Sequence, residues 1–469
     1  MIALFLLVVI ALFGSVHWYL WRRLVRDVSA PGTTWRRVGT VLAVVMPILM
    51  ITAQVAGNIG VPFGVERVLA WPGYYWFVIM LYLLLPLLAA EPVRPLARRV
   101  LARRAARTAT PAAVGPGEPD GLRPGTPETV AGGGGDGLVG TASAETGAGE
   151  SGTGQGDTTH RGGRTATALA EHEPGDAGVT DTDAPGNPTD TTGPRDPGRR
   201  LFVARTVALG AAAIAAGTTT YGTLAARHPV IKEVTVPLRG LPRSAHGYRI
   251  AVVSDIHLGP ILGGSHCRRV VEAVNSTQPD LVTIVGDLVD AGVEDLRSAA
   301  APLADLRSRD GSWYVTGNHE YYVGAEQWID HVRELGITPL ENAREELPWF
   351  DLAGVNDLAG EDSGQGPDLE AALADRDPRR TSVLMAHQPV FVHEAVEHNV
   401  DLQLSGHTHG GQMWPGTHLA DLANPTLAGL ERYGDTQLYV TRGAGSWGPP
   451  VRVGAEPDIT VVRLASPEA

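Results

Sequence analysis

Cysteine is almost absent from this 469-residue chain, in which Cys267 is the only one. A single cysteine excludes an intramolecular disulfide, a disulfide scaffold and a metal site built from several thiolates. A surplus of positive charge is also missing, because the formal net charge is −13. Domains that bind nucleic acid usually need a basic face to displace counterions from phosphates, so no nucleic-acid partner is expected.

Charged residues are missing from three apolar stretches near the start of the chain, at 1–21, 38–65 and 68–90. Each stretch is long enough to cross a hydrocarbon core of about 30 Å as a helix. We therefore expect residues 1–107 to form an N-terminal membrane region with three transmembrane helices. A cleaved signal peptide is the alternative interpretation of the first stretch, but no basic residue precedes it and Arg22 and Arg23 follow it.

Arginines flank these stretches unevenly. The loop after the first stretch holds five of them, whereas the loop before the third holds only Arg67 beside Glu66. Six more arginines follow the third stretch, between Arg94 and Arg107. Because positively charged loops stay in the cytoplasm, the first loop and the tail after the third stretch are expected on the cytoplasmic side.

Phe, Trp, Tyr, Ile and Met are missing from residues 108–198, which are rich in Gly, Thr and Pro. Such a segment cannot bury enough apolar surface to offset the entropy lost on ordering. We expect a disordered linker here.

An apolar run dominated by Ala, Gly and Thr lies within residues 199–228 and follows the pair Arg199 and Arg200. It fits a fourth transmembrane helix, and the paired arginines also resemble a twin-arginine export signal. Either interpretation gives a multi-pass protein of the cell membrane whose remaining residues are extracytoplasmic. The alternative, a peripheral or buried helix, leaves those residues in the cytoplasm.

Residues 229–469 alternate short β-branched apolar runs with stretches of helical period, which is typical of a layered α/β domain. Between the expected strands lie candidate helices at 267–276 and 293–307. The expected strands are 249–254, 281–285, 313–316, 382–386, 401–405, 438–441 and 459–464.

Polar motifs directly follow the first five of these strands. The candidate metal ligands in them are Asp255, His257, Asp287, Asn318, His387, His407 and His409. A mixed set of imidazole, carboxylate and amide donors suits Mn, Fe or Zn better than Mg or Ca. Two such divalent cations can clamp the attacking and leaving oxygens of an in-line displacement and generate hydroxide from a bridging water.

The order of these motifs, D-x-H, G-D, G-N-H-E, a lone H and G-H-T-H, resembles the calcineurin-like metallophosphoesterases from residue 249 to the C-terminus. The G-H-T-H-G-G-Q form and the later R-G-A-G-S-W-G-P-P segment resemble the membrane-associated bacterial branch of that family. The resemblance implies a four-layer α/β/β/α sandwich. It also implies phosphodiesterase-like activity, which in some members acts on nucleotide-linked lipids.

Roles for individual residues follow from the same resemblance. Asp255, His257 and His409 would hold one ion, and Asn318, His387 and His407 the other. Asp287 would bridge the two ions. His319 would lie near the substrate phosphate and Asp290 would orient it, as the catalytic residues. Ala291 and Gly292 stand where the phosphatase branch has an arginine and a glycine, which weakens any assignment to the protein phosphatases.

The expected function is therefore hydrolysis of a phosphodiester or pyrophosphate, in a lipid-linked or nucleotide substrate at the membrane. A phosphomonoesterase and a non-catalytic membrane sensor with the same fold are the alternatives. The segment after His409, the second histidine of G-H-T-H, carries four leucines: Leu419, Leu422, Leu427 and Leu430. We expect core packing for these leucines, with an apolar lip that meets lipid as the alternative. The sequence assigns no oligomeric state.

Overall fold

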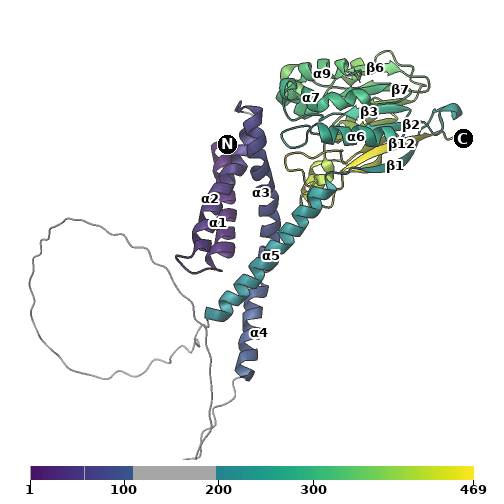
Figure 1. Cartoon of the computed structure of the whole chain (residues 1–469). Helices are drawn as coiled ribbons and strands as arrows, with labels where there is room; N and C mark the ends of the chain where they lie inside the picture. The colour runs from purple at the N-terminus through teal and green to yellow at the C-terminus, as the bar shows by residue number, and fades with distance from the viewer. Residues whose placement is uncertain (1, 58, 109–196) are drawn as a thin grey trace, which may run out of the picture. The chain divides into compact units, whose positions relative to one another are not determined.

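The computed structural model describes residues 2–57, 59–108 and 197–469 (Figure 1). The predicted linker falls almost wholly on residues 109–196, which lie outside the described residues. The helices of the N-terminal region and the long helix after the linker are α1 (Ile2–Trp21), α2 (Thr34–Val55), α3 (Phe63–Ala89), α4 (Val93–Thr108) and α5 (Pro197–Ala225).

Among the described residues, three helices are long and apolar enough to cross a membrane: α2, α3 and the part of α5 at Gly198–Ala225. Helix α1 forms over the first predicted stretch, and its role as a span stays a prediction. Helix α3 packs against both α2 and α5. A Cβ on Gly73 of α3 would collide with the side chain of Ala53 and lie 2.7 Å from the Leu49 carbonyl oxygen, so glycine lets these two helices approach closely.

Two six-stranded sheets follow along the chain. The first has the order β1-β12-β2-β3-β4-β5, and the second has the order β10-β11-β9-β8-β7-β6. The strands of the first sheet are β1 (Val230–Pro237), β2 (Arg249–Val253), β3 (Leu281–Val285), β4 (Ser312–Val315), β5 (Thr338–Pro339) and β12 (Asp458–Ala465). Those of the second are β6 (Ala343–Glu346), β7 (Asp351–Gly354), β8 (Ser382–Met385), β9 (Leu402–Ser405), β10 (Gly429–Tyr433) and β11 (Thr436–Val440). Strands β2 to β5 are parallel, as are β7, β8, β9 and β11, while β12 runs antiparallel to β2.

Helices cover the outer faces of both sheets (Figure 1). Helices α6, α7 and α9 form one hydrophobic cluster with the first sheet, and α10 and α11 contribute to the clusters on the second. The helices of this part are α6 (Gly264–Ser276), α7 (Val293–Ala300), α8 (Asn318–Val323), α9 (Ala325–Glu334), α10 (Leu369–Leu373), α11 (Val392–Glu397) and α12 (Gly416–Ala423). The expected four-layer α/β/β/α sandwich is therefore confirmed.

The alternation of side chains along β2 explains the layers. Ile250 and Val252 point into the core between the two sheets, where they join residues such as Phe350 and Leu404 of the second sheet. Ala251 and Val253 point to the other face and pack under the helices. Both faces of the strand are buried, which is why its sequence is continuously apolar instead of alternating.

All seven strands expected from the sequence are present, with ends that differ by at most two residues. The expected helix at 293–307 is shorter, because α7 ends at Ala300 and a 3-10 turn at Ala301–Asp305 follows. Strands β1, β5, β6, β7 and β10 were not expected. The motifs that follow β2, β3, β4, β8 and β9 thus lie at the carboxyl ends of parallel strands.

Candidate metal centre

The carboxyl ends of β2, β3 and β4 in one sheet face those of β8 and β9 in the other. Each strand is directly followed by a segment that carries one or two of the candidate ligands, and these segments bring all seven together at one rim. Three groups of side chains there lie close enough to hold an ion, and two of these clusters draw on both sheets.

The first cluster consists of Asp255, His257 and His409, whose potential ligand atoms lie within 4.8 Å of one another. His409 Nε2 lies 3.3 Å from Asp255 Oδ1 and 2.9 Å from His257 Nε2. All three side chains are buried. Two imidazole nitrogens this close either share a proton or bind a common cation.

The second cluster consists of Asp287, His387 and His407, again within 4.8 Å. His387 Nε2 lies 3.3 Å from Asp287 Oδ2, and His407 Nδ1 lies 3.0 Å from the amide oxygen of Asn318. The two clusters adjoin, because Asp287 Oδ2 is also 3.7 Å from His257 Nε2. Asp287 therefore has the position that a carboxylate bridging two ions requires.

Asp290 lies beside the first cluster and contacts two histidines with one oxygen. Its Oδ1 is 2.7 Å from His257 Nδ1 and 2.8 Å from His319 Nδ1. The contact with His319 is the one that the sequence led us to expect. The contact with His257 was not expected, and it is the usual arrangement in which a carboxylate fixes the orientation of a metal-binding imidazole.

The backbone at these loops is unusual. Five of the seven candidate ligands have φ between 48° and 70°, namely Asp255, His257, Asp287, His407 and His409. Residues other than glycine rarely adopt this left-handed conformation, which costs about 1–3 kcal/mol at each position. Strain of this kind gathers at functional sites, where the surrounding fold holds side chains in one direction.

Glycines pack closely against the residues with positive φ. A Cβ on Gly406 would collide with Ser254 and Asp255, and one on Gly317 would collide with Asp287. On Gly443 it would lie 2.5 Å from Asp255 Cβ. Backbone is thus packed directly against both carboxylates, and each also accepts a hydrogen bond from a backbone N–H group, Asp255 from His407 and Asp287 from His319.

The residues present fit divalent cations. His387 Nε2 is buried and, among the described residues, has no hydrogen-bond partner, although the Asp287 carboxylate lies nearby. A buried polar atom without a partner is costly unless another group satisfies it. A cation between these nitrogen and oxygen atoms would do so, and four imidazoles with two carboxylates form the mixed donor set of a transition metal.

Protonation of the site without metal follows from burial and charge. Burial lowers the pKa of His257, but the negative charge of Asp290 and its hydrogen bond outweigh this and raise that pKa to about 9. Burial raises the pKa of Asp290, but the positive charge of His257 and its hydrogen bond outweigh this and lower that pKa to about 2. Burial lowers the pKa of His407 to about 4, so this imidazole is neutral and ready to bind a cation at neutral pH.

Two buried charged residues of the site were missed by the sequence analysis. Glu320 accepts hydrogen bonds from the backbone N–H groups of Gly317 and Asp287, at 2.6 and 3.1 Å, and so ties the β4 loop to the β3 loop. Burial and the charge of Asp287 raise the pKa of Glu320 to about 7. Its place after His319 in G-N-H-E was the only signal in the sequence.

Arg452 is the other missed residue, and its side chain is fully buried. It donates to His409 Nδ1 at 2.9 Å and to the His409 carbonyl oxygen at 2.7 Å, and also to the carbonyl oxygens of Arg442 and Gly445. Because guanidinium has no acceptor, His409 Nδ1 must be unprotonated, and Nε2 is the nitrogen turned to the carboxylates. Arg452 therefore sets the orientation of this ring.

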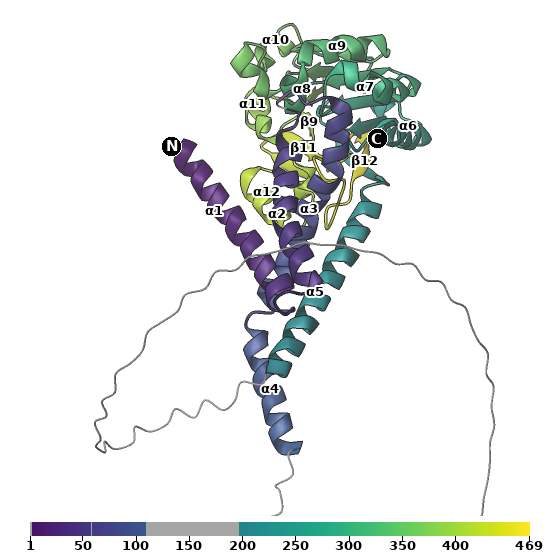
Figure 2. The same ribbon diagram turned by 60° about the vertical axis from the view of Figure 1, so that its left-hand side comes forward.

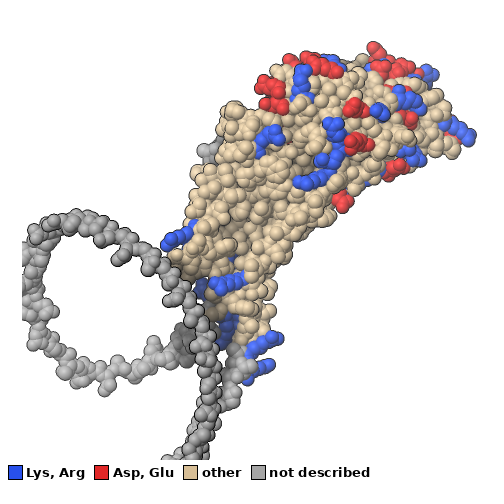
Figure 3. All heavy atoms as spheres, in the orientation of Figure 1, with Lys and Arg blue, Asp and Glu red and all other residues tan. Residues whose placement is uncertain are grey.

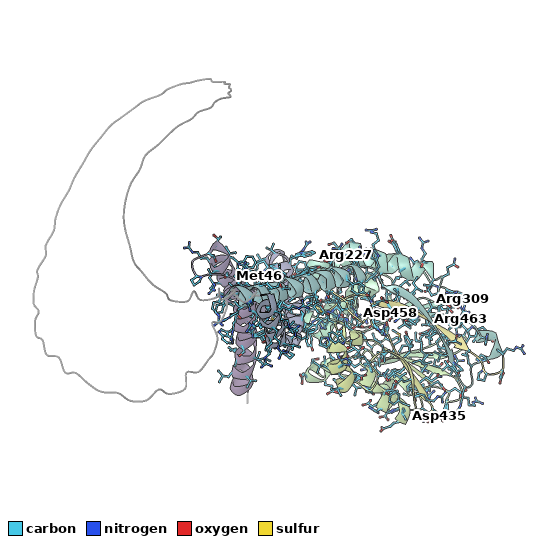
Figure 4. All side chains as sticks on the ribbon, turned by 90° about the horizontal axis from the view of Figure 1, so that it is seen from below. Met46, Arg227, Arg309, Asp435, Asp458 and Arg463 are labelled. Carbon is cyan, nitrogen blue, oxygen red and sulfur yellow. The ribbon has the colours of Figure 1, made fainter. Side chains whose placement is uncertain are left out.

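Asp458, labelled in Figure 4, supports the same region from the start of β12. Its carboxylate accepts from Thr441 Oγ1 at 2.5 Å and from Lys232 Nζ at 2.6 Å. These contacts fix the turn after β11, which carries Gly443 against Asp255.

A pocket of about 590 Å³ opens above the two clusters. Asp287, Asn318, His319, His407 and His409 line its floor. Its walls are largely apolar and include Met413 and Trp447, together with Gln54 of α2 and Phe77 of α3. A substrate that reaches the clusters therefore passes side chains of the N-terminal helices.

Comparison with known proteins agrees with this geometry. Residues 248–411 match the family model described as calcineurin-like phosphoesterase. The chain is 41% identical over 254 residues to a transmembrane protein with metallophosphoesterase domain from Danio rerio, covering 51% of this chain and 58% of that protein. It is 33% identical over 239 residues to an uncharacterized metallophosphoesterase from Aquifex aeolicus, covering 50% of this chain and 91% of that protein.

Among solved structures, a dimetal phosphatase from Danio rerio aligns with 12% identity and a TM-score of 0.30, covering 47% of this chain and 93% of the other. The chain thus spans most of the Aquifex aeolicus relative, but less than two thirds of the Danio rerio transmembrane relative. The aligned part is about half of this chain in both cases.

Proposed function

This chain belongs to the calcineurin-like metallophosphoesterases, and we propose that it hydrolyses a phosphodiester or pyrophosphate bond with two divalent cations. The observation that carries the proposal is the pair of adjoining clusters, in which Asp287 is within 3.7 Å of a histidine of each. When bound, two cations supply positive charge that polarises the phosphoryl group and activates water. The four histidines favour Mn, Fe or Zn over Mg or Ca.

His319 is proposed as the residue that acts on the substrate directly. It lines the floor of the pocket, and its Nδ1 is engaged by Asp290, so its Nε2 is the nitrogen available to a substrate oxygen. A hydrogen bond from Nε2 would stabilise charge on the phosphoryl oxygens or deliver a proton to the leaving group. Positioned proton donors of this kind contribute about 10²–10⁴-fold to the rate.

We assign the seven ligands as the family pattern suggests. Asp255, His257 and His409 hold one ion, and Asn318, His387 and His407 hold the other. The placement of His407 Nδ1 beside the Asn318 amide oxygen supports the second set. Asp287 bridges the two.

The substrate is proposed to be membrane-proximal. Three helices with the length and composition of membrane spans support attachment to the membrane, and Figure 3 shows a broad face with few charged side chains over this part of the chain. The apolar walls of the pocket, with Phe77 of α3 among them, suit a lipid-linked phosphoester better than a small hydrophilic one. The multi-pass topology and an extracytoplasmic catalytic domain are part of this proposal.

Hydrolysis of bis-p-nitrophenyl phosphate by the full chain in detergent with added Mn²⁺ tests the proposal. We expect Asp287→Ala to abolish turnover, because the carboxylate shared by both clusters is lost. We expect His319→Ala to lower kcat about 10²–10⁴-fold while the bound metal is retained. The matched control is His393→Ala, which removes an exposed histidine outside the site.

Three outcomes would contradict the proposal in different ways. Full activity of Asp287→Ala would exclude the two-metal mechanism. Turnover of p-nitrophenyl phosphate without turnover of the diester would favour a phosphomonoesterase. A folded, metal-loaded chain that hydrolyses neither substrate would favour a membrane sensor.

A further inference from the structure

Helix α12 exposes its apolar face. The loop that carries His407 and His409 ends at Met413, and α12 begins three residues later. None of the residues of α12 is buried. Leu419 is 72% exposed and Leu422 is 85% exposed. They are three residues apart, so they lie on the same side of the helix. The expectation that these two leucines pack in the core was therefore wrong.

The polar residues of α12 lie on its other side. At 100° per residue, Leu419, Ala420, Leu422 and Ala423 share one arc, and Thr417, His418 and Asp421 share the opposite arc. Two half-exposed tryptophans belong to the same region of the domain: Trp414 precedes α12 by two residues, and Trp447 lines the same pocket as Ala420. Leucine with tryptophan on one face and polar groups on the other is the pattern of a helix that lies in a membrane interface.

This surface is continuous with the helices that we propose to span the membrane. The Tyr82 hydroxyl of α3 donates to the carbonyl oxygen of Trp414 at 3.0 Å. Met413 belongs to a buried cluster with Met50 of α2 and Val78 of α3. In the view of Figure 2, α12 lies on the side of the domain that faces α3, and Ala420 lines the same pocket as Gln54 and Phe77.

We propose that Leu419 and Leu422 of α12, with Trp414 and Trp447, form an apolar lip that lies in the interfacial layer of the lipid bilayer. The occupant of this face is the bilayer itself, because the segment that leads into α12 contacts α3, one of the helices that we propose to span the membrane. The inference rests on the proposed membrane attachment and adds that the pocket of the metal centre opens at the level of the lipid headgroups.

A fluorescent label at Leu422 tests the lip. Cys267 is fully buried, so Leu422→Cys can be labelled alone with nitrobenzoxadiazole in the full chain reconstituted into phosphatidylcholine nanodiscs. We expect a blue-shifted emission that is quenched at least twofold by phosphatidylcholine carrying a nitroxide near the headgroup. The matched control is Glu345→Cys on the edge strand β6, which is at the far edge of the second sheet from β10. This label should show neither effect.

Two results would overturn the lip. One is equal, weak quenching of the labels at both positions. The other is a blue shift at position 422 without quenching by the nitroxide lipid, since that would show that protein and not lipid covers the helix. Turnover of bis-p-nitrophenyl phosphate by the labelled chain is measured in parallel. Loss of that activity in the wild type and in every variant would count against the proposed function and leave the fluorescence result to decide the lip.

Discussion

His257 is held between a carboxylate and the positions where cations would bind, and this decides how the site takes up metal. Its Nδ1 faces Asp290, and its Nε2 faces both His409 and Asp287. The pKa of His257 in the metal-free chain is about 9, so the ring carries an extra proton at neutral pH. A cation that binds through Nε2 must displace that proton.

Metal affinity should therefore rise with pH until about pH 9. In Asp290→Asn the charge that holds the proton is gone, and the pKa of His257 should fall toward its ordinary value of about 6.5. We expect the variant to release about one proton fewer per chain on binding Zn²⁺ at pH 7.5. Competition titrations with a fluorescent zinc chelator between pH 6.5 and 8.5 measure this as a shallower slope of affinity against pH.

The absolute affinity is a poorer guide here, because the loss of the carboxylate also removes the support of a ligand. Asp435→Asn is the control, since this carboxylate is exposed on the β10–β11 hairpin of the second sheet, whereas the β2 and β3 loops belong to the first sheet. Equal slopes in the wild type and Asp290→Asn would show that the Asp290 carboxylate does not hold the proton.

The sequence predicted which polar residues the structure brings together, but not the conformation of their backbone. All seven candidate ligands come from motifs that end an apolar strand, and the carboxyl ends of parallel strands meet at one edge. The positive φ of residues such as Asp255 and His409 leaves no mark in the sequence, because it is imposed by neighbouring loops. Arg452 was missed for a similar reason: it is 43 residues from His409, and only the fold makes it a partner.

At the scale of elements, the turn after β11 is as important for the site as the strands themselves. Gly443 has φ of 74°, and a Cβ there would lie 2.5 Å from the Cβ of Asp255. Asp458 fixes the turn from β12, so it cannot move away without loss of those hydrogen bonds. A side chain at this position must displace Asp255.

We expect Gly443→Ala to lower the bound metal of the full chain in detergent from two ions toward one, measured by mass spectrometry of the metals. It should also lower the Tm. The matched control is Gly434→Ala, where φ is 61° and the nearest atom to a Cβ is 3.7 Å away. The control has the backbone cost of about 1–2 kcal/mol without the collision. If both variants lose the same amount of metal, contact with Asp255 is not the cause.

Strands were easier to predict in the middle of the sheets than at their edges. β3 is buried at every position, and its apolar sequence is unambiguous. β6 and β10 are edge strands without a fully buried residue, so their polar sequences resemble loops. β7 is central and yet begins with the buried Asp351, which is paired with Arg380 at 2.8 Å, and such a pair is visible only in the structure.

At the scale of the whole molecule, the uneven sequence reflects parts with different surroundings. Apolar helices carry large exposed side chains such as Val41, Ile48 and Leu209, which is expected where lipid replaces water. In Figure 3 the α/β domain carries both acidic and basic side chains. A face with few charged side chains adjoins it, and basic side chains lie at the end of that face farthest from the domain. The average composition of the whole chain shows neither the exposed apolar helices nor the mixed charge of the α/β domain.

The order of the helices also predicts which side of the membrane the metal centre faces. Helix α4 contains six arginines and follows α3 directly, so it should remain in the cytoplasm. If α5 then crosses the membrane, the domain that follows it lies outside. The chain suits a cysteine accessibility experiment, because burial raises the pKa of Cys267 to about 12 and its side chain is fully buried.

We expect Glu345→Cys to react with a membrane-impermeant maleimide in intact cells, and Arg99→Cys on α4 to react only after the membrane is permeabilised. Both positions are exposed, so access to the reagent and not burial decides the result. The unmodified chain should stay unlabelled in both conditions. Labelling of both variants only after permeabilisation would place the metal centre in the cytoplasm. It would also mean that α5 does not cross the membrane. In that case the pocket would still meet the bilayer, but from the inner leaflet, and the substrate would have to be sought there.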